Sequence, residues 1–252
     1  MTNAVGIDSL DWKQNHLLAG MTDEVQERLV PYLEKIPMPL GKVLYESGDT
    51  LRYVYFPTDS IVSLLYVMEN GSTSEISSVG NEGIIGISLF MGGESTPSRG
   101  VVQRAGNAYR LLAHRLKEEF NRHGELLRML LRYTQALLAQ MAQITACNRH
   151  HNIDQQMCRW LLQTLDRLNN NEIVITHELI GNILGVRREG ITDAAGKLQR
   201  LGVIEYRRGH ITVLDRTRLE TLSCECYGVM KRETERLLPY ISARSKKAQL
   251  AP

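Results

Sequence analysis

The segment from Thr176 to Gly202 constrains the fold of this chain more than any other stretch does. It carries two apolar stripes at helical spacing, separated by Gly185. A glycine here can adopt the left-handed conformation that commonly ends a helix, and Thr176 is placed to cap the first helix. Gly181 lacks a side chain where the second helix would cross closely. The first stripe comprises Leu179, Ile180, Ile183 and Leu184, and the second comprises Ile191, Ala194, Ala195, Leu198 and Leu201. We therefore expect two short helices that meet at a sharp corner.

The second of these helices carries polar residues at its outward N-terminal end. They are Arg187, Arg188, Glu189, Thr192 and Asp193. An arginine can donate two hydrogen bonds to guanine and a glutamate can accept one from cytosine, so Arg188 and Glu189 are able to read bases. In a helix-turn-helix this end of the second helix enters the major groove of DNA. The alternative is an ordinary helical hairpin whose charges are solvated. We interpret the segment as a DNA-reading helix-turn-helix, with Thr176 also near the DNA.

A second element follows directly, between Val203 and Leu214. Two β-type runs flank Gly209, which is the pattern of a β-hairpin. Arg207, Arg208 and His210 lie near its tip, where they could contact phosphates and so position the protein without reading sequence. The sequence thus predicts a wing beside the two helices.

Charge is distributed unevenly along the 252 residues, although the net charge is only +2. Residues 1–145 hold 13 Lys and Arg against 16 Asp and Glu, whereas residues 146–252 hold 17 against 12. A polyanion would therefore bind the second half. No apolar leader opens the chain and no run is long enough to span a membrane, so we expect a cytoplasmic protein with no membrane partner.

The N-terminal part contains short β-rich runs separated by glycine and proline turns. They lie at residues 42–46, 53–56, 61–67, 75–79 and 101–112. Such spacing favours an antiparallel sandwich or barrel, and we expect a small β-roll within a sensing domain of residues 1–116. We assign no role to residues 1–20, and expect a helix over residues 22–36. The overall fold class is α+β.

One long helix is predicted next, over residues 117–147. Its apolar residues repeat at spacings of three and four, which is typical of a helix seam. The seam comprises Leu127, Leu130, Thr134, Leu137, Met141 and Ile144. Since further apolar residues lie to its side, we expect one face to pack on the β-roll and the seam to form a homodimer interface. The alternative is burial of this stripe by the DNA-binding domain of the same chain.

The helical pattern weakens between Cys147 and Asn152, where we place a hinge between domains. The DNA-binding domain is expected over residues 148–217, with a helix at 153–168 and a short strand at 173–175. Residues 218–252 would form one amphipathic helix and a polar, frayed tail.

The order of these elements resembles that of the Crp/Fnr family of bacterial transcription regulators. The resemblance covers residues 17–214. Its motifs are GKVLYESGD from Gly41 to Asp49, YFP from Tyr55 to Pro57, GNILGVRRE from Gly181 to Glu189 and KLQRLGVI from Lys197 to Ile204. It implies a homodimeric DNA-binding regulator on an inverted repeat, and contact with RNA polymerase if the protein is an activator. Arg188 and Glu189 match the family's base-reading pair, but Asp193 replaces a common second arginine, which implies an altered operator.

The resemblance also implies an effector pocket in the β-roll. Its candidate residues are Gly86, Ile87, Ser88, Ser98, Arg99 and Gly100. Cyclic-AMP sensors of the family have a glutamate where Ile87 stands, and they carry Arg-Ser or Arg-Thr where this chain has Ser98-Arg99. An unpaired ribose hydroxyl against Ile87 would cost on the order of 1 to 3 kcal/mol. We therefore expect an unidentified small effector, or none, rather than cyclic AMP.

The four cysteines and seven histidines are the candidate ligands for a metal ion. No cysteine precedes Cys147, which excludes the N-terminal iron–sulfur sensor that some relatives carry. On one continuous helix Cys147, His151 and Cys158 would share a face able to bind zinc, but the predicted hinge breaks that helix. Cys224 and Cys226 are expected to point to different sides of a helix. We therefore predict no metal, no cofactor and no catalytic residues. The remaining alternative function is a ligand-gated protein-interaction module.

Overall fold

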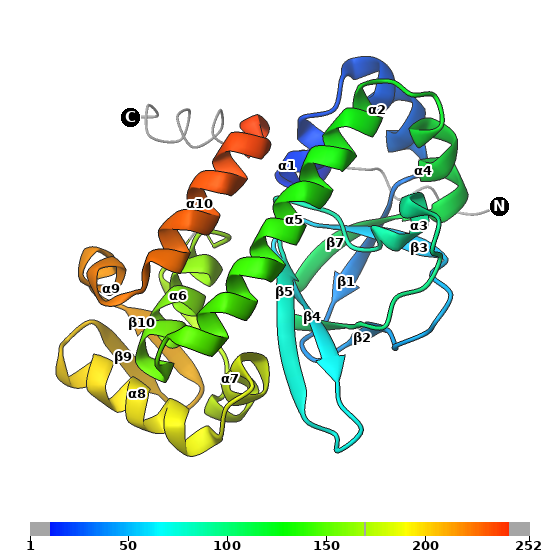
Figure 1. The fold of residues 1–252 in the computed structure, drawn as a ribbon. Helices are drawn as coiled ribbons and strands as arrows, with labels where there is room; N and C mark the ends of the chain where they lie inside the picture. Colours follow the sequence, from blue (N-terminus) through cyan, green and yellow to red (C-terminus); the bar gives the residue numbers. More distant parts are fainter. Residues whose placement is uncertain (1–10, 169, 242–252) are drawn as a thin grey trace, which may run out of the picture.

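The computed structural model describes residues 11–168 and 170–241. In Figure 1 a β-roll and a smaller helical domain lie on opposite sides of one long helix, and the C-terminal helix runs beside it. The strands are β1 (Glu34–Met38), β2 (Val43–Tyr45), β3 (Tyr53–Pro57), β4 (Ile61–Val67), β5 (Thr73–Val79), β6 (Arg99–Arg104), β7 (Gly106–Leu112), β8 (Glu172–Val174), β9 (Ile204–Arg207) and β10 (His210–Val213). The helices are η1 (Asp11–Gln14), α1 (His16–Ala19), α2 (Asp23–Leu29), η2 (Val30–Tyr32), α3 (Ser88–Met91), α4 (Ala113–Phe120), α5 (Glu125–His150), α6 (Ile153–Leu165), α7 (His177–Leu184), α8 (Arg188–Arg200), α9 (Arg216–Leu222) and α10 (Glu225–Leu237).

The β-roll consists of two antiparallel sheets, with strand orders β1-β7-β3 and β2-β6-β4-β5. Alternation of side chains builds its core, since Val54 and Phe56 on β3 are fully buried while Tyr53 and Tyr55 are half-buried. The run expected at 101–112 is two strands, β6 and β7, which belong to different sheets. Gly106 permits the change of sheet, because a Cβ there would lie 2.7 Å from the backbone nitrogen of Ser60. The predicted antiparallel roll is confirmed.

Two predictions about the N-terminal region are wrong. The helix expected over residues 22–36 ends at Leu29, and β1 begins five residues later at Glu34 and pairs with β7. Pro31 has no backbone N–H to continue the helix. Residues 11–20, to which we assigned no role, are part of the core: the Asn15 side chain donates to the carbonyls of Pro57 (2.8 Å) and Gly83 (2.9 Å).

The long helix also departs from expectation. It is interrupted at residues 121–124, where His123 has a φ of 57°, so that α4 and α5 are separate helices. Within the predicted dimer seam, Leu130, Thr134, Leu137 and Ile144 are buried, and Leu127 and Met141 are half-buried. The β-roll covers this stripe on one side and α10 packs along α5 on the other (Figure 1). Four of the six seam residues are therefore buried within the chain, which contradicts a dimer interface made of the whole seam. The β-roll and α10 cover them, rather than the DNA-binding domain expected over residues 148–217.

The C-terminal domain has its own core between α6, α7, α8 and the sheet β8-β10-β9. Within the segment predicted as a hinge, α5 continues to His150, and only His151 and Asn152 separate it from α6. Asn152 caps α6 in a capping box with Gln155. The single terminal helix that we expected is broken at Ser223 and Cys224 into α9 and α10. The tail predicted to be frayed lies outside the described residues.

The two domains are in direct contact through β5 and the loop after it. At one end of β5, Thr73 Oγ1 donates to the carbonyl of Asn182 on α7 (3.2 Å). At the other end, Arg167 forms an ion pair with Glu82 (2.8 Å) and donates to the Ser78 carbonyl (3.1 Å). The β-roll and the C-terminal domain are thus fixed together at two points.

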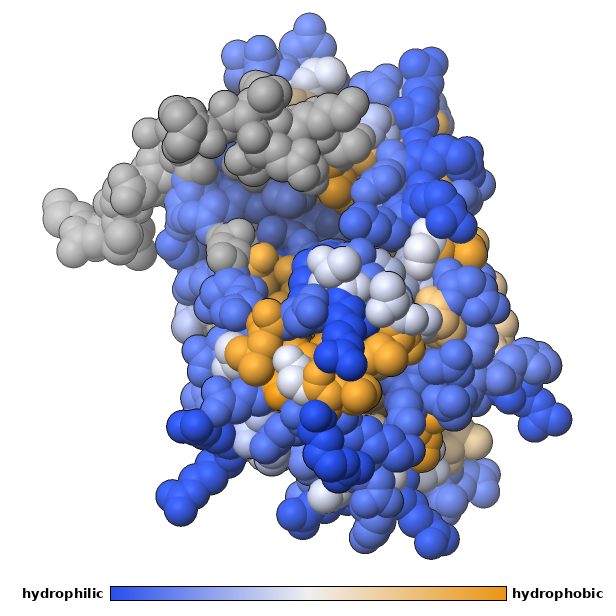
Figure 2. Space-filling view, turned by 90° about the vertical axis from the view of Figure 1, so that its left-hand side faces the viewer, coloured by the Kyte–Doolittle hydropathy of each residue, from blue (hydrophilic) through white to orange (hydrophobic). Residues whose placement is uncertain are grey.

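The surface in Figure 2 is mostly hydrophilic, with one hydrophobic patch near the centre of the face shown. Of the helices that the structure describes, none has the length and hydrophobicity needed to cross a membrane.

Candidate nucleic-acid interface

The predicted corner is formed by α7 and α8. Thr176 Oγ1 accepts a hydrogen bond from the backbone nitrogen of Leu179 (3.2 Å) and so caps α7. Gly185 ends the helix in the left-handed conformation (φ 68°), and its N–H donates to the Gly181 carbonyl. A Cβ on Gly181 would lie 2.9 Å from the carbonyl oxygen of Val186, so the chain can turn this tightly only at a glycine. The cap at Thr176, the helix end at Gly185 and the close crossing at Gly181 all agree with the sequence prediction.

All nine residues expected to contact DNA are exposed. Arg187, Arg188 and Glu189 lie at the N-terminus of α8 and are exposed, whereas Ile191 and Ala194 further along the helix are buried. Among the residues that the structure describes, neither arginine forms an ion pair. The fork of each guanidinium group is therefore available to an acceptor outside the chain.

Thr192 and Asp193 lie one turn further along α8, and Thr192 is held by its own domain. Its hydroxyl lies 3.1 Å from the Arg188 carbonyl and 3.1 Å from His177 Nδ1. The contact with His177 involves a residue that the sequence analysis did not identify as part of this surface. The His177 ring stacks on Tyr206 at 4.0 Å between centroids, which joins α7, α8 and β9. Burial, and then the charge of Arg188, lowers the pKa of His177, so its ring is neutral near pH 7.

The wing is a two-residue hairpin between β9 and β10. Arg208 and Gly209 have φ angles of 42° and 88°, the positive values that suit a tight hairpin turn. Two of the three predicted phosphate contacts already have acidic neighbours in the chain: Arg207 pairs with Glu205 and His210 with Glu172 (2.8 Å). Arg208 forms no ion pair within the described residues, and it stands at the tip.

The candidate effector residues lie on both sides of α3. Gly86, Ile87 and Ser88 lead into that helix, and Ser98, Arg99 and Gly100 lead into or begin β6. Arg99 Nη2 donates to Glu46 (2.8 Å), and the Ser98 hydroxyl interacts with Tyr45. Two buried polar atoms of these candidate residues, Ser88 Oγ and Arg99 Nε, have no hydrogen-bond partner among the residues that the structure describes. A cavity of about 300 Å³ lies elsewhere, between the two domains, where Asn81, Glu82, Arg167 and Lys231 are among its lining residues.

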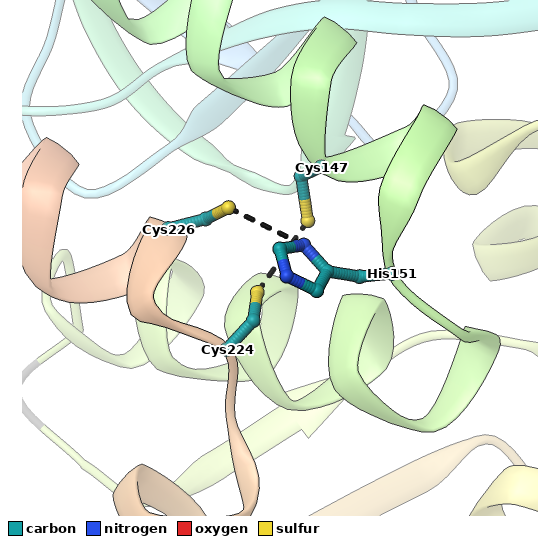
Figure 3. Close-up of side chains that lie close together, drawn as sticks. All are labelled: Cys147, His151, Cys224 and Cys226. Carbon is teal, nitrogen blue, oxygen red and sulfur yellow. Dashed lines mark hydrogen bonds between the residues drawn. The ribbon is translucent and has the colours of Figure 1, made fainter.

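The cysteines are arranged differently from the prediction. Cys224 precedes α10 as its N-cap and Cys226 lies inside the helix, so the two do not diverge as residues of one helix would. Figure 3 shows both pointing toward Cys147 and His151. Cys158 instead lies in the core of the C-terminal domain. The expected absence of a metal-ligating set is therefore corrected: four such residues converge.

These features define a two-domain protein in which a β-roll is joined by a long helix to a winged helix-turn-helix. Residues 155–222 match the family described as the Crp-like helix-turn-helix domain. The match covers the helix-turn-helix region, and about three quarters of the chain has the fold of solved Crp/Fnr regulators. The resemblance drawn from the sequence motifs is confirmed.

Several solved structures share this fold. FixK2 from Bradyrhizobium japonicum is 15% identical with a TM-score of 0.65, covering 76% of this chain and 98% of that one. The c-di-GMP responsive global regulator CLP from Xanthomonas campestris is 13% identical with a TM-score of 0.62, covering 77% and 100%. A transcriptional regulator of the CRP family from Thermus thermophilus is 16% identical with a TM-score of 0.62, covering 75% and 96%. No curated protein sequence matches the chain.

Proposed function

We propose that this protein is a sequence-specific DNA-binding transcription regulator that acts as a homodimer on an inverted repeat. The observation that carries the proposal is that Arg187 and Arg188 at the N-terminus of α8 are exposed and form no ion pair with any residue that the structure describes. In a helix-turn-helix that end of the second helix lies in the major groove, and two copies would read half-sites about 34 Å apart.

Base reading is assigned to Arg188 and Glu189, and phosphate contact to Arg208. An arginine pairs best with guanine and a glutamate with cytosine, so adjacent guanine and cytosine positions are expected in each half-site. Asp193 cannot donate to a base as an arginine would, which supports an operator that differs from the usual sequence of the family. Thr192 serves this surface by orienting its neighbours, since its hydroxyl is engaged with Arg188 and His177.

Dimerisation is assigned to the outer stripe of α5 rather than to the buried seam. Leu131 and Leu138 are 53% and 56% exposed and lie seven residues apart, with Gln135 and Ala142 completing the stripe. A heptad spacing of this kind suits an antiparallel or parallel contact between two copies of the helix.

Control by a small effector is assigned to the β-roll. The partnerless Ser88 Oγ and Arg99 Nε support a polar or anionic ligand beside α3, because buried polar atoms are normally hydrogen-bonded. Ile87, which is half-buried and apolar, disfavours the ribose of cyclic AMP at this point.

The proposal is tested by selecting bound sites from random DNA and then measuring Arg188→Ala on the selected site. We expect a loss of about 1 to 3 kcal/mol and relaxed preference at one base position. Arg208→Ala is the matched control: it should weaken all sequences alike and reduce the slope of log K against log salt by about one. Equal weakening of every sequence by Arg188→Ala would refute base reading, and affinity without salt dependence would favour the protein-interaction alternative.

A further inference from the structure

Four metal-binding side chains converge where α5 ends and α10 begins. Cys147 and His151 come from the last turn of α5 and the residue after it, and Cys224 and Cys226 come from the start of α10. Their ligand atoms all lie within 4.8 Å of one another, and the three cysteines are buried (Figure 3). We propose that this Cys₃His cluster is a structural zinc site that ties α10 to the end of α5.

The spacing of the ligand atoms suits a single tetrahedral ion. Cys147 Sγ and Cys224 Sγ are 3.5 Å apart, and Cys226 Sγ and His151 Nδ1 are also 3.5 Å apart. A tetrahedral zinc ion with Zn–S bonds of about 2.3 Å has ligand–ligand edges of roughly 3.8 Å. Three thiolates and one imidazole form one of the sets that hold zinc structurally, and a cluster this small leaves no room for a polynuclear iron–sulfur centre.

The second nitrogen of His151 has the partner that a zinc-bound imidazole commonly has. Nδ1 faces the sulfur atoms, while Nε2 lies 3.2 Å from the carboxylate of Glu225. A carboxylate in this position fixes the orientation of the ring and the nitrogen that carries the proton, which leaves the other nitrogen free to bind a metal. Simple packing of thiols would not require this arrangement.

The charges around the cluster are also compatible with a zinc–thiolate group. Three thiolates and one Zn²⁺ carry one net negative charge, and a buried cation is in contact with them. Arg159 is 1% exposed, and its Nε donates to Cys147 Sγ (3.2 Å) while Nη1 donates to Gln163 (2.7 Å). Gln143 Nε2 donates to Cys226 Sγ (3.1 Å). The charge of Glu75 acts on Arg159 as well, and a zinc–thiolate group would place a further negative charge in direct contact with the guanidinium.

The test uses the full chain, purified under reducing conditions without chelator. Mass spectrometry under non-denaturing conditions should find about one zinc ion per chain. After exchange with Co²⁺, the protein should show the charge-transfer absorption of cobalt–thiolate bonds together with the intense visible bands of tetrahedral Co²⁺. Removal of the metal by a strong chelator should lower the melting temperature, and added Zn²⁺ should restore it.

Variants separate metal binding from packing. His151→Gln and Cys226→Ser should each lose the cobalt spectrum and weaken zinc binding at least tenfold. Cys158→Ser is the matched control, because Cys158 is equally buried but lies in the neighbouring core. It should keep the metal and the cobalt spectrum.

Two results would overturn the proposal. In one, the folded wild-type chain binds neither zinc nor cobalt while all its thiols remain reduced. In the other, the metal-free chain readily forms a disulfide between Cys147 and Cys224 and zinc does not protect them, which would make the cluster a redox pair. None of these measurements involves DNA, so they stand apart from the test of base reading.

Discussion

Glu75 shows how a single side chain can make the stability of this protein depend on pH. It lies buried on β5, and Ser63 Oγ is 2.5 Å from its carboxylate and 2.7 Å from Gln103 Oε1. One hydroxyl proton cannot serve both acceptors, so the network is complete when Glu75 carries a proton of its own and donates it. Burial raises the pKa of Glu75 to about 7, with the Ser63 hydrogen bond opposing the shift.

The substitution Glu75→Gln should remove this pH dependence. The pKa in the folded state is above the unfolded value, so Glu75 contributes stability that is full below about pH 4.5 and is lost as the pH rises to about 7. Relative to the variant, the wild-type free energy of unfolding should fall by on the order of 3 kcal/mol across that window. Urea titrations at several pH values measure the difference, and parallel curves for the two proteins would contradict the assignment.

Among the helical glycines, Gly181 and Gly196 should respond oppositely to the same substitution by alanine. A Cβ on Gly181 would meet the Val186 carbonyl at 2.9 Å, whereas on Gly196, within α8, the nearest atom would be the flexible end of Arg200 at 3.5 Å. Gly196→Ala should therefore stabilise the protein by about 0.5 to 1 kcal/mol, because glycine is a poor helix former. Gly181→Ala should destabilise the protein, because the backbone at Val186 would have to move to make room for the added Cβ. Denaturant midpoints compare the two, and a stable Gly181→Ala would show that the corner tolerates a side chain.

Elements whose signals are local could be predicted from the sequence. The cap at Thr176, the stop at Gly185 and the hairpin at Gly209 each depend on residues within a few positions. The strand β1 could not be, because Glu34–Met38 continues a helical pattern and becomes a strand only by pairing with β7 far along the chain. The Cys₃His cluster was missed for the same reason: its halves are more than seventy residues apart, and the break before α10 that brings them together has no glycine or proline to mark it.

At the scale of the whole molecule, periodicity showed that α5 is amphipathic but not what covers it. The sequence contains two apolar stripes on that helix, and only the fold reveals that α10 and the β-roll cover the richer one. The thinner stripe around Leu131 and Leu138 remains exposed. A partner subunit is therefore expected to pack against Leu131 and Leu138, on the side of α5 that has fewer apolar residues.

Replacing Leu131 and Leu138 together by lysine should convert the proposed dimer into monomers. Like charges placed on both copies of the stripe would repel, and the apolar contact would be lost. Analytical ultracentrifugation measures the mass, and affinity for a two-half-site operator should fall more than affinity for one half-site. Val229→Lys, which changes a partly exposed residue on α10, should leave the mass unchanged. A double lysine variant with the mass of the parent would place the interface elsewhere.

The strand β5 has a consequence for how a signal could travel. Its first residue is bonded to the last turn of α7, and Ser78, near its other end, is bonded to Arg167 just beyond α6. Because β5 is hydrogen-bonded near both ends, its movement would also move α7 and the segment after α6. The arginines at the start of α8 follow directly after α7. A rearrangement of that sheet is therefore expected to reorient Arg187 and Arg188 within the same chain.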